Sequence, residues 1–202
     1  MVAPNSIPVN TLKTYKMTLV DRAIISFAKI ENPTRSDLNF VRIQSQVQSG
    51  IDTYRLGAMQ MTQIQLEEES HSSSRMAKFM REYNDNRLAA CDCHAMVSGK
   101  HVLAAPMRAI MAWCMMRIDD PRNGCWLPRS YDHLNQVPTW LKNAVPHQGL
   151  HNPAYYQWLE GFINTDSIDG LEDLINVLRQ IRTRLQAGAL RPDAWPKRSE
   201  KT

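Results

Sequence analysis

Apolar residues recur three and four positions apart through the first part of the chain, as one face of a helix requires. This pattern predicts a first helix that starts near Leu12 and ends before Pro33, because proline interrupts a helix. Thr34 is a suitable N-cap for a second helix, and a short helix is expected over residues 76–83. Residues 1–87 therefore predict a helical N-terminal region, which is either a scaffold or an adaptor, linker or partner-binding surface.

From Leu88 onward, shorter apolar pieces alternate with turn-forming residues. The pattern predicts a strand or tight hairpin over residues 88–97 and an extended piece over residues 125–128. Four helices are expected, over residues 103–116, 140–145, 155–163 and 171–185. Gly188 is placed to end the last helix. We therefore expect an α+β fold that is mostly helical, with one domain over residues 88–190 and a basic, flexible tail over residues 191–202.

Composition narrows the class of protein only moderately. The chain has 202 residues, 43% of them hydrophobic, which suffices for one well-buried domain with a helical extension. Its net charge of +4 is compatible with a polyanionic partner. No apolar stretch is long enough to predict a membrane span, and no signal peptide is visible at the N-terminus. The four cysteines are few and unevenly spread, which favours a reducing compartment.

Histidines provide the candidate chemistry. His147 and His151 stand four residues apart, so that one turn of chain can direct both imidazoles to one metal ion, and Gly149 lets that turn tighten. His94 is available as a third ligand. Three histidines with open positions would suit a catalytic metal, because water and substrate must reach the ion.

Two other interpretations of the same residues stay open. The histidines could be ordinary core or surface residues, because this spacing also occurs by chance. Alternatively, a structural zinc could be held by the group formed by Cys91, Cys93, His94 and Cys125.

An ordered set of motifs in the second half resembles the AHH family of toxin nucleases, a branch of the HNH or ββα-metal superfamily. The motifs are a histidine block, an alanine-rich helix, an Asn-Gly turn leading to an apolar pair and proline, and HxxxH followed by tyrosines. In this chain they correspond to residues 93–97, 104–110, 118–128 and 147–156. The resemblance covers about residues 90–190.

The resemblance implies a small ββα-metal core and an endonuclease that hydrolyses phosphodiester bonds, most plausibly in double-stranded DNA, with RNA as the alternative. His94, His147 and His151 would hold one divalent ion of the magnesium, zinc, manganese or nickel class. Asn123 would hydrogen-bond the backbone near the strand and fix the general base, although a simple Asn-Gly turn is the other interpretation.

Ala95 departs from the family pattern. The pattern has a second histidine here, which would take a proton from the attacking water and which alanine cannot replace. The expected catalytic residues are therefore His94 and Asn123, together with position 95, where Ala95 stands in place of the general base. Either the histidine was replaced on purpose, which would permit expression of a lethal protein, or the chain is a natural homologue that binds without cutting. The intact remaining motifs favour the first explanation.

Basic residues near the motifs are candidates for phosphate contacts, with one tyrosine beside the histidines: Arg108, Arg122, Arg129, Lys142 and Tyr155. The resemblance further implies an antibacterial toxin with a cognate immunity protein. Such a toxin would be made in the bacterial cytoplasm, exported by a specialised secretion system through a carrier or adaptor, and active in the target-cell cytoplasm. The alternative is a non-enzymatic, zinc-stabilised module that binds nucleic acid or protein.

Overall fold

The computed structural model describes residues 17–82 and 88–197. It divides into two compact units, Met1–Gly50 and Ile51–Thr202, and is mostly helical with one two-stranded antiparallel sheet. The expected mostly helical α+β class is therefore confirmed. None of the helices in the described ranges is both long and apolar enough to cross a membrane.

The first unit contains two helices joined by a short turn. Helix α1 (Leu19–Phe27) is capped by Thr18. The side chains of Thr18 and Asp21 each accept a hydrogen bond from the other's backbone N–H. The expected helix start near Leu12 lies outside the described residues; within them, the capping box places the start of α1 at Leu19. Thr34 caps α2 (Arg35–Leu56) as predicted, by accepting from the Asp37 amide. This second helix continues into the second unit.

The second unit holds the sheet and most of the helices. After α2 its elements are α3 (Gln63–Glu67), α4 (Ser73–Glu82), β1 (Cys91–Ala95), α5 (Ala105–Trp113), β2 (Gly124–Pro128), α6 (Pro153–Glu160) and α7 (Leu171–Gln186). The helices expected near residues 103–116, 155–163 and 171–185 are present. The one expected over residues 140–145 is wrong: a single 3-10 turn, Thr139–Leu141, stands there. Pro146 contributes to this outcome, since it disfavours the helical conformation of the residue before it.

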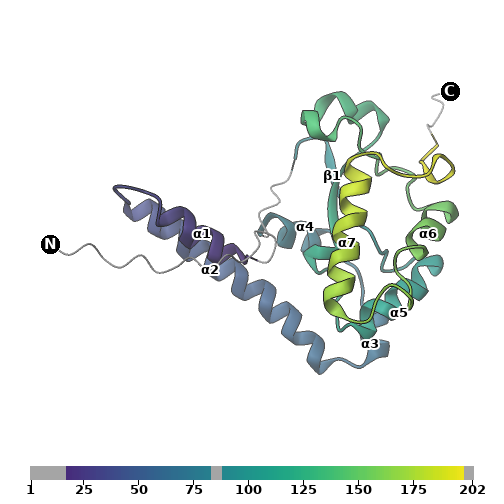
Figure 1. Cartoon of the computed structure of the whole chain (residues 1–202), viewed down its shortest axis with the longest axis horizontal. Coiled ribbons are helices and arrows are strands. Elements are labelled where there is room, and N and C mark those ends of the chain that lie inside the picture. Colours follow the sequence, from purple (N-terminus) through teal and green to yellow (C-terminus); the bar gives the residue numbers. More distant parts are fainter. Residues whose placement is uncertain (1–16, 83–87, 198–202) are drawn as a thin grey trace. The chain divides into compact units, whose positions relative to one another are not determined.

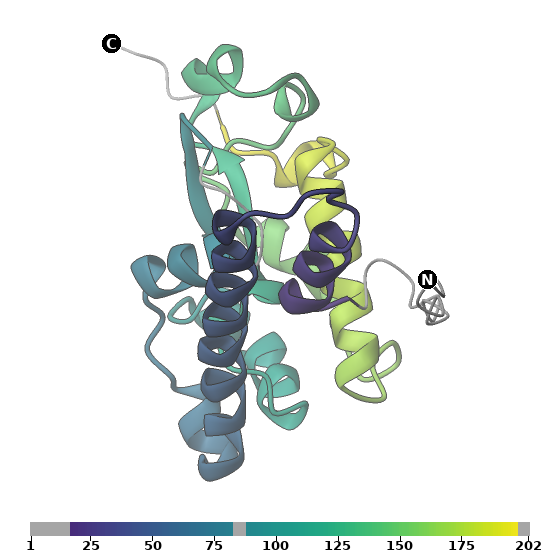
Figure 2. The same cartoon turned by 90° about the vertical axis from the view of Figure 1, so that its left-hand side faces the viewer.

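The sheet separates two packing faces. Strands β1 and β2 lie side by side (Figure 2). In their ladder, His94 stands opposite Cys125 and Ala95 opposite Gly124. Because successive side chains of a strand point to opposite faces, His94 and Ala95 face opposite ways. Cys125 belongs to the main core formed with α5, α6 and α7, whereas Ala95 belongs to a smaller cluster under α4.

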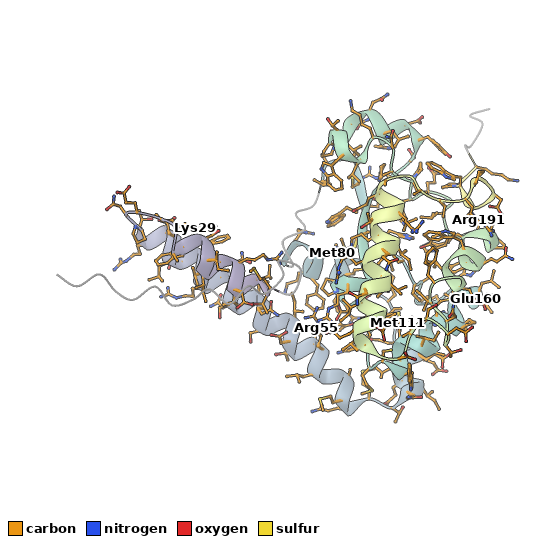
Figure 3. All side chains as sticks on the ribbon, in the orientation of Figure 1. Lys29, Arg55, Met80, Met111, Glu160 and Arg191 are labelled. Carbon is orange, nitrogen blue, oxygen red and sulfur yellow. The ribbon has the colours of Figure 1, made fainter. Side chains whose placement is uncertain are left out.

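The main core is rich in alkyl side chains. Helix α7 runs along the sheet and contributes four buried residues at helical spacing (Figure 1): Leu174, Leu178, Ile181 and Leu185. Met111 of α5 is among the side chains that fill the space between these helices (Figure 3). Past the end of α7, Gly188 adopts a φ of +72°, and a Cβ there would lie 2.1 Å from the Asn143 carbonyl oxygen. Glycine is thus required at the predicted helix end.

Three buried carboxylates form hydrogen bonds that connect the segment before β2 with the helices that precede β1. Glu69 accepts from Arg117, from the Tyr54 hydroxyl and from the Ile118 amide. Asp119 accepts hydrogen bonds from Arg75 and from the Ser72 amide, and it is also hydrogen-bonded to His71. Asp120 accepts hydrogen bonds from Arg55 and from the Arg122 amide. We call this group of Glu69, Asp119 and Asp120 the carboxylate cluster.

Candidate metal centre

Three histidines from two separate parts of the second unit converge. His94 is the fourth residue of β1, and His147 and His151 flank a tight turn in which Gly149 has a φ of +81°. One ring nitrogen of each lies within 4.8 Å of the other two. The ring centroid of His94 lies 5.2 Å from that of His147 and 4.8 Å from that of His151. The sequence therefore identified three residues that meet in space, although the segment between His147 and His151 is an irregular turn.

His94 is held with one nitrogen unused. Its Nε2 lies 3.0 Å from the Tyr155 hydroxyl, which itself donates to the Met96 carbonyl at 2.9 Å. The hydroxyl has one proton, so it must accept from His94 Nε2–H, and Nδ1 keeps its lone pair. That Nδ1 is buried and has no hydrogen-bond partner among the described residues. Burial, then the neighbouring His151, hold the pKa of His94 well below its usual value, so the ring is neutral.

The other two histidines are oriented in the same manner. His151 Nδ1 lies 2.7 Å from the Tyr156 hydroxyl, and burial, followed by His147, lowers the pKa of His151 to about 4. His147 Nδ1 lies 3.4 Å from a carboxylate oxygen of Asp92, whose other oxygen accepts from Arg129 at 3.2 Å. Each imidazole thus has one nitrogen occupied by a neighbour, and such contacts fix the orientation of a metal-binding histidine.

These residues fit a divalent metal ion. A buried ring nitrogen without a partner normally costs free energy, and a metal ion would satisfy it. Neutral imidazoles are ligands that zinc and related ions accept, and three of them leave room for water or substrate. His94, His147 and His151 form the one group of this kind found in the described part of the chain.

The four-ligand zinc interpretation is not supported. Cys91 and Cys93 occupy alternate positions of β1 and face α4, whereas His94 and Cys125 face the main core. The sheet therefore separates the cysteines of β1 from His94 and Cys125.

Asn123 makes the backbone contacts expected of it. Its side-chain oxygen accepts from the Val97 amide at 2.8 Å, and its Nδ2 donates to the carbonyls of Val97 and Ile118 at 3.0 and 2.9 Å. Asn123 is completely buried. It thus joins the chain after β1 to the chain before β2, a role beyond that of a simple turn residue.

Ala95 lies under α4. Its side chain is 5% exposed and shares a cluster with Met76 and Met80. On the paired strand, a Cβ at Gly124 would lie 2.5 Å from the Met80 sulfur, so α4 sits directly on this face. A larger side chain at position 95 would have to displace these methionines.

The five predicted phosphate contacts have different surroundings. Arg108 donates to the carbonyls of Ser98 and His101, and Arg122 is paired with Asp120. Arg129 is 49% exposed beside Asp92, and Lys142 is exposed. The expectation that Tyr155 contacts phosphate is corrected: Tyr155 is fully buried, and its hydroxyl is engaged by His94 and Met96.

The sequence analysis did not predict the role of two residues that orient the histidines. Asp92 shares a strand face with His94, and Tyr156 follows Tyr155 in the first turns of α6. An acidic residue two positions before a strand histidine was the available signal for Asp92. The ring of Tyr156 stacks on that of His101, with centroids 4.3 Å apart, and on that of His151, with centroids 5.8 Å apart.

Comparison with known proteins agrees with this geometry. Residues 75–190 match the profile of AHH, described as a nuclease family of the HNH/ENDO VII superfamily with conserved AHH. The match starts before Leu88 and takes in most of α4, which the resemblance recognised from the motifs did not. No curated protein and no solved structure matches the chain. Because the matched region exceeds half of the chain and contains all three histidines, the chain belongs to the AHH nuclease family.

Proposed function

We propose that the second unit is an endonuclease domain that hydrolyses phosphodiester bonds of DNA at a single divalent metal ion. The observation that carries this proposal is the buried Nδ1 of His94, which lacks a partner among the described residues and lies beside two further imidazoles. Membership of a nuclease family supports the reaction class. RNA is the alternative substrate.

His94, His147 and His151 would hold the ion. When bound, such an ion polarises a phosphate and stabilises the charge that develops on the leaving oxygen. Tyr155, Tyr156 and Asp92 keep the imidazoles oriented for this task.

Ala95 removes the group that would activate water. A methyl group cannot accept a proton, and loss of a general base typically costs about 10²–10⁴-fold in rate. We therefore expect the chain with Ala95 to bind nucleic acid and to cut it very slowly. The wider role that we propose is an antibacterial toxin, secreted with a carrier or adaptor and neutralised by an immunity protein.

One observation favours a second candidate, a domain that binds nucleic acid without cutting it. Ala95 fits closely under Met76 and Met80, as a native residue of a well-packed cluster would. In that case the histidines would bind metal without turnover.

Restoring histidine separates the two candidates. Ala95→His should produce metal-dependent nicking of plasmid DNA that chelator abolishes, and the double variant with Met80→Ala should cut faster because α4 leaves more room. Ala95→Gln, similar in size but without a proton acceptor suited to neutral pH, is the matched control. If both histidine variants are folded and bind metal yet leave DNA and RNA intact, the nuclease proposal is wrong and the binding domain is favoured.

A further inference from the structure

A groove lies between α4 and the sheet, next to the histidines. It has a volume of about 350 Å³, and its lining includes His147 and Asp92 together with residues of α4. His147 is also one of the three converging histidines. A ligand in this groove would therefore touch one residue of the candidate metal centre.

One face of α4 gives the groove its chemistry. Ser73, Ala77 and Arg81 line it at four-residue spacing, so they stand one above the other along the helix. Ser73 and Arg81 are exposed, and the small Ala77 leaves room between them. Hydroxyl and guanidinium groups at this spacing suit an extended anion such as a nucleic-acid backbone.

Among the described residues that line the groove, one is acidic, and its charge is compensated. Asp92 interacts with His147 through one carboxylate oxygen and with Arg129 through the other. Arg129 is about half exposed and places a second guanidinium beside Asp92. The balance of charge along the groove thus permits a phosphate to approach His147.

We propose that this groove holds the nucleic-acid strand beside the scissile phosphate, with Arg81 as a phosphate-binding residue. The inference rests on the proposed function and names the path of its substrate. The groove opens on the α4 side of β1, the face to which the side chain of position 95 also points. A strand in it would contact both His147 and α4.

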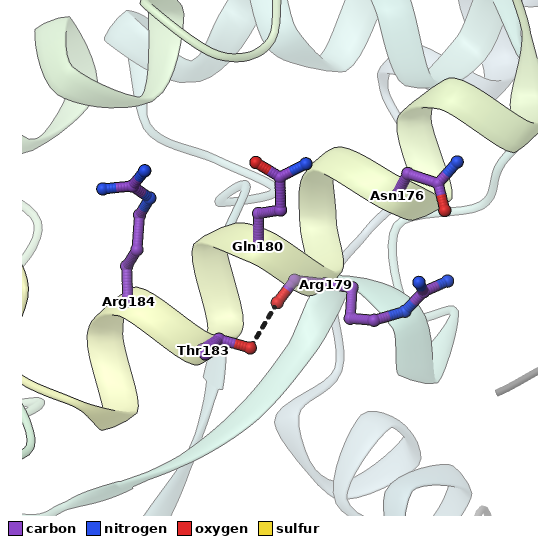
Figure 4. Close-up of a pocket in the computed structure, with 5 residues that line it drawn as sticks. All are labelled: Asn176, Arg179, Gln180, Thr183 and Arg184. Carbon is purple, nitrogen blue, oxygen red and sulfur yellow. Dashed lines mark hydrogen bonds between the residues drawn. The ribbon is translucent and has the colours of Figure 1, made fainter. Parts of the chain in front are cut away.

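A second basic hollow offers a rival path. It has a volume of about 550 Å³ and, in the described part of the chain, is lined by α7 residues that include Arg179 and Arg184 (Figure 4). The Arg184 guanidinium lies 5.2 Å from the ring centroid of Phe162. None of the lining residues described there is a histidine, so this hollow lacks the link to the metal centre that His147 gives the groove.

The test compares arginine variants in the otherwise unchanged chain, whose Ala95 limits cleavage during binding. Affinity for a short DNA duplex, a short DNA single strand and a short RNA is measured by fluorescence anisotropy over a range of salt concentrations, with thermal melts to verify folding. Arg81→Gln should weaken binding several-fold and reduce the salt-dependence slope by about 0.7–0.9, the loss expected for one phosphate contact. Ala77→Leu should also weaken binding by filling the groove, and Arg184→Gln should change neither quantity.

The outcomes are distinguishable. If the unchanged chain binds neither DNA nor RNA, the proposed function fails, and the groove proposal fails with it. If it binds but Arg81→Gln and Ala77→Leu bind equally well, the groove is not the path although the function stands. A reduced slope in Arg184→Gln alone would assign the contact to α7 and overturn the groove.

Discussion

The histidine centre and the carboxylate cluster both bury polar side chains in the second unit, but they satisfy them differently. In the cluster, every carboxylate has guanidinium or amide donors, as Glu69 has with Arg117 and Ile118. In the centre, His94 keeps one buried nitrogen without a partner in the described structure. A satisfied network holds a fold together, whereas a group left incomplete indicates a place for a ligand. The comparison predicts that one region governs stability and the other governs binding.

The largest effect on stability is expected from Glu69→Ala. It leaves the half-buried guanidinium of Arg117 without its carboxylate, and removing one partner of such a pair costs about 3 kcal/mol. Chemical denaturation in the presence of chelator measures this loss without a contribution from metal. Glu68→Ala, an exposed neighbour, is the control and should leave stability unchanged. Equal stability of the two variants would contradict the structural role of the cluster.

The histidine centre should show the opposite behaviour. His147→Ala should greatly weaken metal binding and leave the metal-free fold almost intact, because the scaffold does not depend on the ion. With metal at roughly 100 times its dissociation constant, binding adds about 2.7 kcal/mol to the unchanged chain, and chelation removes that amount. Titration calorimetry and paired melts measure both quantities, with His133→Ala as control. Unfolding of the unchanged chain on chelation would instead identify a structural metal.

A smaller effect is expected from the residues that orient the ligands. Tyr156→Phe removes the hydroxyl beside His151 Nδ1 and should weaken metal binding about 10-fold, the lower end for loss of such a contact. Tyr131→Phe, whose hydroxyl donates to the Pro196 carbonyl, provides a control away from the centre. Unchanged affinity in Tyr156→Phe would mean that ring packing alone orients His151.

The smallest effect concerns acid stability. Burial disfavours the charged form of Asp120, but the adjacent Arg55 and Arg122 together outweigh this effect and lower the pKa of the carboxyl below its ordinary value. The ionised form therefore stabilises the fold above the unfolded-state pKa of about 3.9, and this contribution is lost as the pH falls through the folded-state pKa. Asp120→Asn should flatten the acid side of the stability curve. A curve as steep as that of the unchanged chain would assign the acid sensitivity to other groups.

Local patterns predicted the elements that depend on neighbours in sequence. The period of α7, the cap at Thr34 and the glycine at position 188 each involve contacts within a few residues, and all three are present. The predicted helix over residues 140–145 was wrong because apolar spacing alone could not outweigh the proline that follows. The domain boundary between residues 87 and 88 stays a prediction.

The site was predictable only where a motif names it. His94, His147 and His151 follow from spacing and resemblance, and their convergence agrees with both. The burial of Tyr155 depends on how α6 packs, which the sequence pattern does not show, and a phosphate contact was therefore predicted for this residue. The same reason applies to Arg81, since its relation to His147 arises only when α4 packs against the sheet.

The long stretch of chain between His94 and His151 has a consequence for synthesis. When β1 leaves the ribosome, the turn that carries the other two histidines and the tyrosines that orient two of the three rings have not yet been made. Pairing of β1 with β2 can begin earlier, but the contact between His94 and the later histidines must wait until the segment that carries them has been made. A growing chain therefore cannot assemble the centre until translation has passed Tyr156. Until that point the unfinished polypeptide lacks the complete set of histidines, and it cannot hold a metal ion in the way proposed for the full chain.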